Sequence, residues 1–227
     1  MEFKELEVRI VFDFFPFNKD ARGINNLGGS ENSWPGLSRA KFSTQLTAVI
    51  ITNIYGQSAD FEKIMSICDQ KIIPIIEDAA ESLGAEYQSK KSGSFGLLSI
   101  LSFNGNKIVT AGVGGAVLTA SEHSFKKVDY LSKQAKDDSF NYVHNEMGFN
   151  YRLSNINAAL GLAQAENLKA ILEKKNDIHN LYKKYFKENE KFEIMDTPDY
   201  ARNNNWLNIL KVLNGNKDGI LLSLIHI

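Results

Sequence analysis

The sequence predicts an α/β fold, in which helices cover a mainly parallel β-sheet. Residues 48–54 (AVIITNI) form a β-branched run that is typical of a buried strand. Residues 58–70 carry apolar side chains at helical spacing, and residues 72–76 (IIPII) form a second apolar run. Because a strand, a helix and a strand in this order need a crossover connection, the two strands should be parallel neighbours.

The first predicted helix holds the single cysteine of the chain. Its apolar stripe consists of Phe61, Ile64, Met65 and Cys68. Cys68 is therefore expected to be a buried core thiol. A single thiol cannot form an internal disulfide, which favours a reducing, cytoplasmic location.

The middle of the chain continues the α/β pattern. Residues 79–83 predict a short helix, and the Gly/Ser-rich residues 90–96 predict a turn. Residues 97–103 and 115–119 predict two further strands, and residues 121–136 predict a helix.

The following part is mainly helical. Residues 142–152 form a mixed polar and aromatic loop, after which Ser154 has the chemistry of a helix N-cap. An apolar stripe predicts one long helix over residues 155–186. Residues 187–205 are polar and turn-like, and residues 206–213 (WLNILKVL) predict a strand with little chain left to pair with it.

Composition excludes several classes of function. The chain has 227 residues and a formal net charge of −1, so nothing attracts it as a whole to nucleic acid or to an anionic membrane. The histidines are scattered without metal-ligand spacing, so no metal site is expected. The apolar tail at residues 219–227 is shorter than the roughly 20 residues that span a bilayer, and acidic residues near the N-terminus argue against a signal peptide. An anionic ligand would therefore need a local site.

Two positions could form such a site. Asp78 ends a predicted buried strand, where ligands of open α/β sheets bind, and its carboxylate could pair with a cationic ring nitrogen. Alternatively, Asp78 only caps the helix predicted after it. Ser102 and Lys107 stand in the segment SFNGNK at the end of another strand, where the hydroxyl could donate to a phosphate oxygen and the lysine could reach the same ligand. Alternatively, Lys107 is an ordinary surface lysine in a turn. The glycines of residues 112–115 (GVGG) allow close approach of the backbone to a ligand.

Four ordered segments carry a resemblance to a known family. They are IIEDAAESLGAEY, GSFG, LSFNGNKIVTAGVGGAVLT and HNEMGFNYRLSNINAALGLAQ. In this order they resemble the DegT/DnrJ/StrS family of sugar-nucleotide aminotransferases, which depend on pyridoxal phosphate (PLP), and the likeness extends over about residues 47–213. The resemblance implies a PLP-dependent transferase of fold type I (aspartate aminotransferase-like), usually a homodimer with its active sites at the subunit interface.

The resemblance also implies roles for individual residues. Asp78 matches the aspartate that pairs with the pyridinium nitrogen, and Glu81 lies where many members carry glutamine or histidine against the cofactor ring. Ser102 matches a phosphate ligand, and Lys107 matches the lysine that forms the Schiff base. A carboxylate such as Asp78 would keep the ring nitrogen protonated, which is the state in which PLP best stores electrons.

Two later residues and the reaction type follow from the same resemblance. Asn150 matches an asparagine that reaches the cofactor phosphate of the partner subunit, and Arg152 is expected to line the same interface as a substrate-binding residue. Some relatives carry histidine in place of the lysine and perform dehydration, so Lys107 favours transamination.

The substrate class is inferred from the stretches AESLGAEY, QAKDDSFNYVHNEMGFNYRLSN and NNNWLNIL. These stretches resemble enzymes of legionaminic-acid and bacillosamine pathways, which implies a UDP-linked 4-keto-6-deoxy-N-acetylhexosamine as substrate and glutamate as amino donor. The alternatives are another keto-sugar or a cyclitol as substrate, or an inactive truncated chain.

The expected organisation has four parts. Residues 1–43 form an atypical segment and a candidate for non-native sequence. They show no clear period, and they fit poorly in the place of the strand and helix that should follow the family's Gly-Thr-Ala-like phosphate turn, which is not found. Residues 44–153 form part of the PLP-binding large domain, and residues 154–190 form a long connecting helix. Residues 191–227 form the truncated start of a small C-terminal domain, in which residues 221–227 match nothing in the family pattern.

Overall fold

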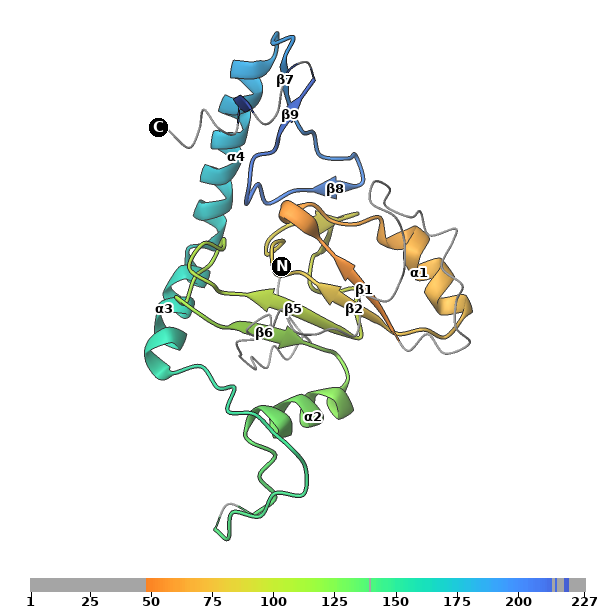
Figure 1. The fold of residues 1–227 in the computed structure, drawn as a ribbon, viewed down its shortest axis with the longest axis vertical. Helices are drawn as coiled ribbons and strands as arrows, with labels where there is room; N and C mark the ends of the chain where they lie inside the picture. The colour runs from red at the N-terminus through yellow and green to blue at the C-terminus, as the bar shows by residue number, and fades with distance from the viewer. Residues whose placement is uncertain (1–47, 139, 214, 216–218, 221–227) are drawn as a thin grey trace.

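The computed structural model describes residues 48–138, 140–213, 215 and 219–220. Its central sheet has the order β1-β2-β5-β6, and these strands are β1 Val49–Thr52, β2 Ile75–Asp78, β5 Leu98–Ser102 and β6 Gly115–Leu118. β1, β2 and β5 are parallel, whereas β6 runs antiparallel to β5. The predicted α/β fold with a mainly parallel sheet is therefore confirmed (Figure 1). The segments 1–43 and 221–227 lie outside the described residues.

Helices lie on three sides of this sheet in Figure 1. α1 (Phe61–Gln70) lies at the right, α2 (Glu122–Ser132) lies below the sheet, and α3 (Asn155–Glu166) and α4 (Leu168–Phe186) form a column at the left. The loop that joins β5 to β6 packs against this column, where its buried residues contact Leu168, Ile171 and Leu172. The column therefore supports the loop that carries Lys107.

The link from α1 to β2 begins with a left-handed residue, Ile72, whose φ is 55°. The N–H of Ile72 donates to the carbonyl of Asp69 at 3.1 Å. The N–H of Ile73 donates to the carbonyl of Cys68 at 2.9 Å. This pattern is a Schellman motif, which usually has glycine at the position of Ile72. Because the motif uses residues 72 and 73, β2 starts at Ile75 rather than at residue 72.

A hydrophobic core lies between α1 and the sheet, and its buried members are Ile51, Phe61, Cys68, Ile75 and Tyr87. The rings of Phe61 and Phe95 stack with centroids 4.3 Å apart. The prediction that Cys68 is a buried thiol is confirmed, since it is 3% exposed. Each large apolar side chain in this core contributes roughly 1.5–3 kcal/mol by leaving water.

A fully buried carboxylate, Glu77, lies beside this core in β2. It accepts hydrogen bonds from Asn53 Nδ2 (2.8 Å), Ser92 Oγ (3.1 Å), Gly93 N (2.7 Å), Phe95 N (2.9 Å) and Ser99 Oγ (3.1 Å). Asn53 follows β1, Ser99 belongs to β5, and the other three donors lie in the turn at residues 92–95. Glu77 therefore connects three parts of the sheet layer, a role that the sequence did not predict.

The short helix predicted over residues 79–83 is wrong, because the structure has only turns there. The N–H of Ser82 donates to the carbonyl of Ala79 and the N–H of Ala85 to the carbonyl of Ser82, so the bonds do not continue as a helix. The carbonyls of Glu81 and Leu83 instead accept the side chain of Asn204 at 2.8 and 3.0 Å. A residue far along the chain thus determines this backbone.

Two of the predicted helices have different limits in the structure. α2 ends at Ser132 instead of residue 136, because Gln134 and Ala135 both have positive φ. The single helix predicted over residues 155–186, within the connecting helix of residues 154–190, is divided at Asn167 into α3 and α4. The N-cap predicted at Ser154 is confirmed, since its hydroxyl accepts the N–H of Asn157 at 3.3 Å.

Short strands complete the described chain. β3 (Glu86–Tyr87) pairs with β4 (Lys90–Lys91) and with β8 (Ala201–Arg202). β9 (Leu210–Val212) pairs with β7 (Phe192–Ile194), so the strand predicted over residues 206–213 has its partner inside the segment that was predicted to be turn-like. Figure 1 shows β7 and β9 beside the upper end of α4. None of the helices described here is long and apolar enough to cross a membrane.

Candidate functional site

The carboxyl ends of the parallel strands meet at one edge of the central sheet. Thr52, the last residue of β1, pairs with Asp78, the last residue of β2. Asp78 in turn pairs with Ile100, and β5 ends two positions later at Ser102. The chain then enters the loop that carries Lys107. Ligands of open α/β sheets bind at such an edge.

The carboxylate of Asp78 has few partners within the chain. It accepts one hydrogen bond from the described residues, from the N–H of Ala80 at 3.1 Å. The main chain of Asp78 is fixed separately, since its carbonyl accepts the N–H of Asn53 at 3.0 Å. Asp78 therefore caps a turn rather than a helix, and most of its acceptor capacity is not used by the described residues.

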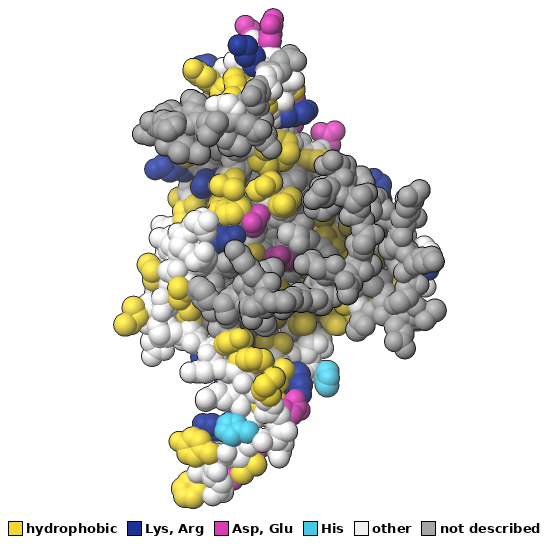
Figure 2. Space-filling model, viewed as in Figure 1, with side chains coloured by type: hydrophobic (Ala, Val, Ile, Leu, Met, Phe, Trp, Pro, Cys, Tyr) yellow, Lys and Arg dark blue, Asp and Glu magenta, His cyan; other side chains and the backbone are white. Residues whose placement is uncertain are grey.

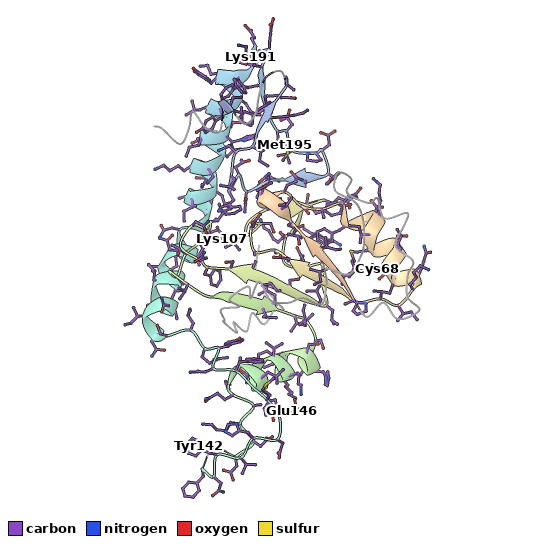
Figure 3. All side chains as sticks on the ribbon, viewed as in Figure 1. Cys68, Lys107, Tyr142, Glu146, Lys191 and Met195 are labelled. Carbon is purple, nitrogen blue, oxygen red and sulfur yellow. The ribbon has the colours of Figure 1, made fainter. Side chains whose placement is uncertain are left out.

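The side chain of Lys107 is only 14% exposed. Its Nζ lies 3.7 Å from Glu81 Oε1 and 4.1 Å from the centroid of the Trp206 ring. Within the described part of the chain, Nζ donates no hydrogen bond. Figure 3 shows Lys107 at the left of the sheet, close to the helical column and far from Tyr142 and Glu146 in the lower hairpin. Lys107 is therefore not an ordinary surface lysine.

The loop around Lys107 is closed by main-chain hydrogen bonds. The N–H of Phe103 donates to the carbonyl of Gly114 at 2.7 Å, and the N–H of Lys107 donates to the carbonyl of Asn104 at 3.1 Å. Gly112 and Gly114 both have positive φ, which glycine adopts without strain. A fixed backbone holds Lys107 at the sheet edge.

Ser102 precedes this loop at the end of β5. Its Oγ accepts the N–H of Asn104 at 3.4 Å, and within the described part of the chain its hydroxyl hydrogen has no acceptor. Ser102 and Asp78 thus stand at the ends of neighbouring strands.

Glu81 is fixed on the other side of the lysine. Its Oε2 accepts the N–H of Tyr55 at 2.6 Å, while its Oε1 faces Lys107. The structure thus brings Glu81 and Lys107 together, which the sequence predicted only through the family resemblance.

The sequence did not predict two further residues of this region, Trp206, which contacts Lys107, and Asn204, which binds Trp206. Trp206 is 8% exposed, and its Nε1 donates to the carbonyl of Asn106 at 2.7 Å. The N–H of Trp206 donates to Asn204 Oδ1 at 2.9 Å. The sequence feature that could have indicated them is the stretch NNNWLNIL, in which Trp206 is predicted to start a strand.

Asn150 and Arg152 lie elsewhere in the chain and are both exposed. Asn150 pairs with Lys133 just after α2, and Arg152 Nη1 lies 3.2 Å from Asp129 Oδ1. Among the described residues, neither of them contacts Lys107. The part of the chain that the structure covers also contains no group of three or more His, Cys, Asp or Glu side chains that could hold a metal ion.

Comparison with known proteins gives one consistent result. Residues 38–225 match the model of the DegT/DnrJ/EryC1/StrS aminotransferase family. EpsN of Bacillus subtilis is 45% identical over 170 residues, which is 74% of this chain and 43% of that protein. A UDP-4-amino-4,6-dideoxy-N-acetyl-β-L-altrosamine transaminase of Campylobacter jejuni is 34% identical over 186 residues, or 81% of this chain and 50% of that protein. The GDP-perosamine synthase of Vibrio cholerae is 37% identical over 145 residues, or 64% of this chain and 40% of that protein.

Solved structures agree with this match. The aminotransferase PseC of Helicobacter pylori, which acts in the biosynthesis of pseudoaminic acid, superimposes with a TM-score of 0.73 and 26% identity, over 82% of this chain and 50% of PseC. A DegT/DnrJ/EryC1/StrS aminotransferase of Brucella abortus gives a TM-score of 0.71 and 25% identity, over 79% of this chain and 47% of that protein. The chain thus spans about half the length of the relatives that it matches.

Proposed function

This chain belongs to the DegT/DnrJ/EryC1/StrS aminotransferase family, and from that premise we propose that it is the cofactor-holding part of a PLP-dependent nucleotide-sugar aminotransferase. One observation carries the proposal. The amine of Lys107 is largely buried at the carboxyl edge of the sheet, and it has no hydrogen-bond acceptor among the described residues. The amine contacts only Glu81 Oε1 at 3.7 Å and the Trp206 ring at 4.1 Å among these residues, so its N–H groups are available to a ligand.

The residues at this edge fit the chemical groups of PLP. Lys107 would hold the cofactor covalently through its amine, and Asp78, whose carboxylate accepts one hydrogen bond from the described chain, would pair with the ring nitrogen. Ser102 would donate to the phosphate, and Glu81 would lie beside the ring. Solved structures of the fold include one described as a PLP form, at 20% identity and a TM-score of 0.73.

Each residue then has a definite task. When bound, PLP supplies an electron sink that stabilises negative charge on a substrate carbon. Asp78 favours the protonated ring nitrogen by placing a negative charge next to it. Lys107 would hold the cofactor through its amine, and when that amine is free, Nζ would accept and donate the proton that transamination moves. The low exposure of Lys107 limits competition from water.

Asn150 and Arg152 are proposed to complete the site of a second subunit. Both are exposed and contact the end of α2 rather than Lys107. The hairpin between α2 and α3 exposes Phe140 (90%) and Met147 (82%), and hydrophobic side chains are visible at the lower end of the molecule in Figure 2. An exposed apolar hairpin of this kind supports contact with another protein surface, and a homodimer is the simplest arrangement.

The proposed reaction transfers an amino group from glutamate to a UDP-linked 4-keto-6-deoxy-N-acetylhexosamine during surface-glycan biosynthesis. The 34% identity to the Campylobacter jejuni altrosamine transaminase supports this substrate. The 37% identity to a GDP-perosamine synthase supports a second candidate, a GDP-linked keto-sugar. The proposed location is the cytoplasm, which the single buried thiol of Cys68 supports.

The decisive experiment measures covalent binding of PLP to Lys107. The purified chain is titrated with PLP, its visible absorbance is recorded, and the adduct is fixed with borohydride and mapped by peptide mass spectrometry. The wild type should show the band with the added mass on Lys107, and Lys107→Ala should show neither. Lys107→Arg, which keeps the positive charge, is the control for non-specific binding of the phosphate. A wild-type chain without the band would support the alternative of an inactive piece.

The same absorbance measures the role of Asn150. In a homodimer, a mixture of Lys107→Ala and Asn150→Ala chains forms hybrids that retain one complete site. We expect the mixture to recover about a quarter of the wild-type band by statistical assortment. If Asn150 acted within its own chain, the hybrids would add no complete site. Coupled glutamate assays with UDP-linked and GDP-linked 4-keto-sugars then separate the two substrate candidates.

A further inference from the structure

The amine of Lys107 is held without hydrogen bonds from the described chain. Glu81 Oε1 is 3.7 Å away, which is beyond the ~3.2 Å limit of a normal N–H···O bond. The ring centroid of Trp206 is 4.1 Å away, well within the ~6 Å range of cation–π attraction. Both contacts attract a positive charge, but neither fixes the direction of an N–H bond. The amine is therefore held near these partners while it can still be released to a ligand.

The position of the Trp206 ring is determined by hydrogen bonds. Its Nε1 donates to the carbonyl of Asn106, the residue before Lys107, at 2.7 Å. Its own N–H donates to Asn204 Oδ1 at 2.9 Å, and its carbonyl accepts Lys175 Nζ of α4 at 3.1 Å. The ring is thus fixed both to the Lys107 loop and to the helical column.

The same segment also holds the second partner of the amine. Asn204 is 2% exposed, and its Nδ2 donates to the carbonyls of Glu81 and Leu83 at 2.8 and 3.0 Å. Gly56 is required for this fit, because a Cβ there would lie 1.9 Å from Asn204 Oδ1. These hydrogen bonds and the two contacts of the amine link six residues, which we call the lysine clamp: Tyr55, Glu81, Asn106, Lys107, Asn204 and Trp206.

We infer that Trp206 is a positioning residue that shields the amine of Lys107 and holds it beside Glu81, so that docking of the segment after α4 controls the reactivity of the lysine. The inference deepens the proposed function, because it concerns the lysine proposed to bind the cofactor. The indole face stabilises the charged amine and excludes solvent from one side of it. Loss of the indole should expose the amine and increase its reactivity before any cofactor is bound.

The test measures the reactivity of Lys107 in the full chain without PLP. Dilute acetic anhydride acetylates free amines, and peptide mass spectrometry gives the rate at Lys107 relative to Lys169, whose side chain is 92% exposed. The test variant is Trp206→Leu, which removes the ring. The matched control is Val109→Ala, because Val109 is 1% exposed and belongs to the same hydrophobic cluster as Trp206. Circular dichroism establishes that each variant is folded at the temperature of the assay.

We expect Trp206→Leu to raise the relative labelling of Lys107 by about three- to tenfold, as befits the loss of a partly buried cation–π contact. Trp206→Phe, which keeps an aromatic face, should raise it by less than about threefold. Val109→Ala should leave it unchanged, although it also weakens the cluster. If Trp206→Leu does not fold, Trp206→Met fills the same space without a ring.

Two results would overturn the inference. One is an unchanged labelling ratio in the leucine or methionine variant. The other is an equal rise in Val109→Ala, which would show that the ratio only reports the loosening of the cluster. Because no cofactor is present, a chain that fails to bind PLP can still pass this test. Conversely, a chain that binds PLP with an unchanged ratio would contradict only the role of Trp206.

Discussion

Two carboxylates stand next to each other at the end of β2, and their surroundings are opposite. Glu77 is fully buried and accepts five hydrogen bonds from its own chain. Asp78 is partly exposed and accepts one from the described residues. The difference arises because successive side chains of a strand point to opposite faces of the sheet. One face of β2 is closed by protein donors, and the other meets the edge where the candidate ligand site lies.

This contrast separates a structural acid from a candidate functional one. A carboxylate whose acceptor positions are filled by its own backbone and hydroxyl groups cannot take a further ligand without losing them. A neighbour with unused acceptor capacity can bind a cationic group at little cost to the fold. The pair Glu-Asp in the sequence does not reveal which is which, but the count of donors does.

The largest expected effect comes from exchanging each acid for its amide. Glu77→Gln should lower the free energy of unfolding by about 3 kcal/mol, because its amide hydrogens would face donors that now point at oxygen. Asp78→Asn should lower it by less than about 1 kcal/mol, since one hydrogen bond is affected. Urea unfolding followed by circular dichroism measures both.

The two variants should rank in the reverse order for cofactor binding. Asp78→Asn is expected to weaken or shift the visible band of bound PLP under conditions in which the chain is fully folded. Equal losses of stability in the two variants would contradict the distinction between the two faces of β2.

Much of the fold was predictable because its signals are local. The β-branched run of β1, the apolar stripe of α1 and the cap at Ser154 each depend on residues that are close in sequence. The turn after Asp78 was mispredicted as a helix because its backbone is bound by a distant residue. Asn204, more than 100 positions away, donates its side-chain amide to the carbonyls of Glu81 and Leu83.

The candidate site shows the same limit. Asp78, Ser102 and Lys107 could be selected from the sequence because they end or follow strands, yet an ordinary role was also available for Asp78 and for Lys107. The contact between Lys107 and Trp206 joins two segments 99 positions apart, counted from 107 to 206, and no local pattern encodes it. What the sequence could not supply was the surroundings of the lysine.

A second prediction concerns Ile72, in the link between α1 and β2. Ile72 has φ of 55° and is 91% exposed, so its side chain gains little from packing while its backbone is strained. Ile72→Gly should raise the free energy of unfolding by about 1 kcal/mol, because glycine adopts this conformation without the ~1–2 kcal/mol penalty. Ile72→Ala, which retains a Cβ, is the matched control and should show at most part of this gain. An unchanged urea midpoint in the glycine variant would mean that the strain at Ile72 is negligible.

The smallest expected effect is a pH dependence at the outer edge of the closed face, where α1 begins. A hydrogen bond from Lys63 and a second one from the Tyr87 hydroxyl (2.8 Å) hold the pKa of Asp60 below its ordinary value of 3.8. Because the folded pKa is the lower one, Asp60 stabilises the fold above pH ~4, and this contribution is lost as the pH falls through the folded pKa. Asp60→Asn lacks the titrating group, so the stability difference between wild type and variant should shrink between pH 5 and pH 2, as measured by urea unfolding at several pH values. A difference that stays constant over this range would show that Asp60 gains nothing from its partners.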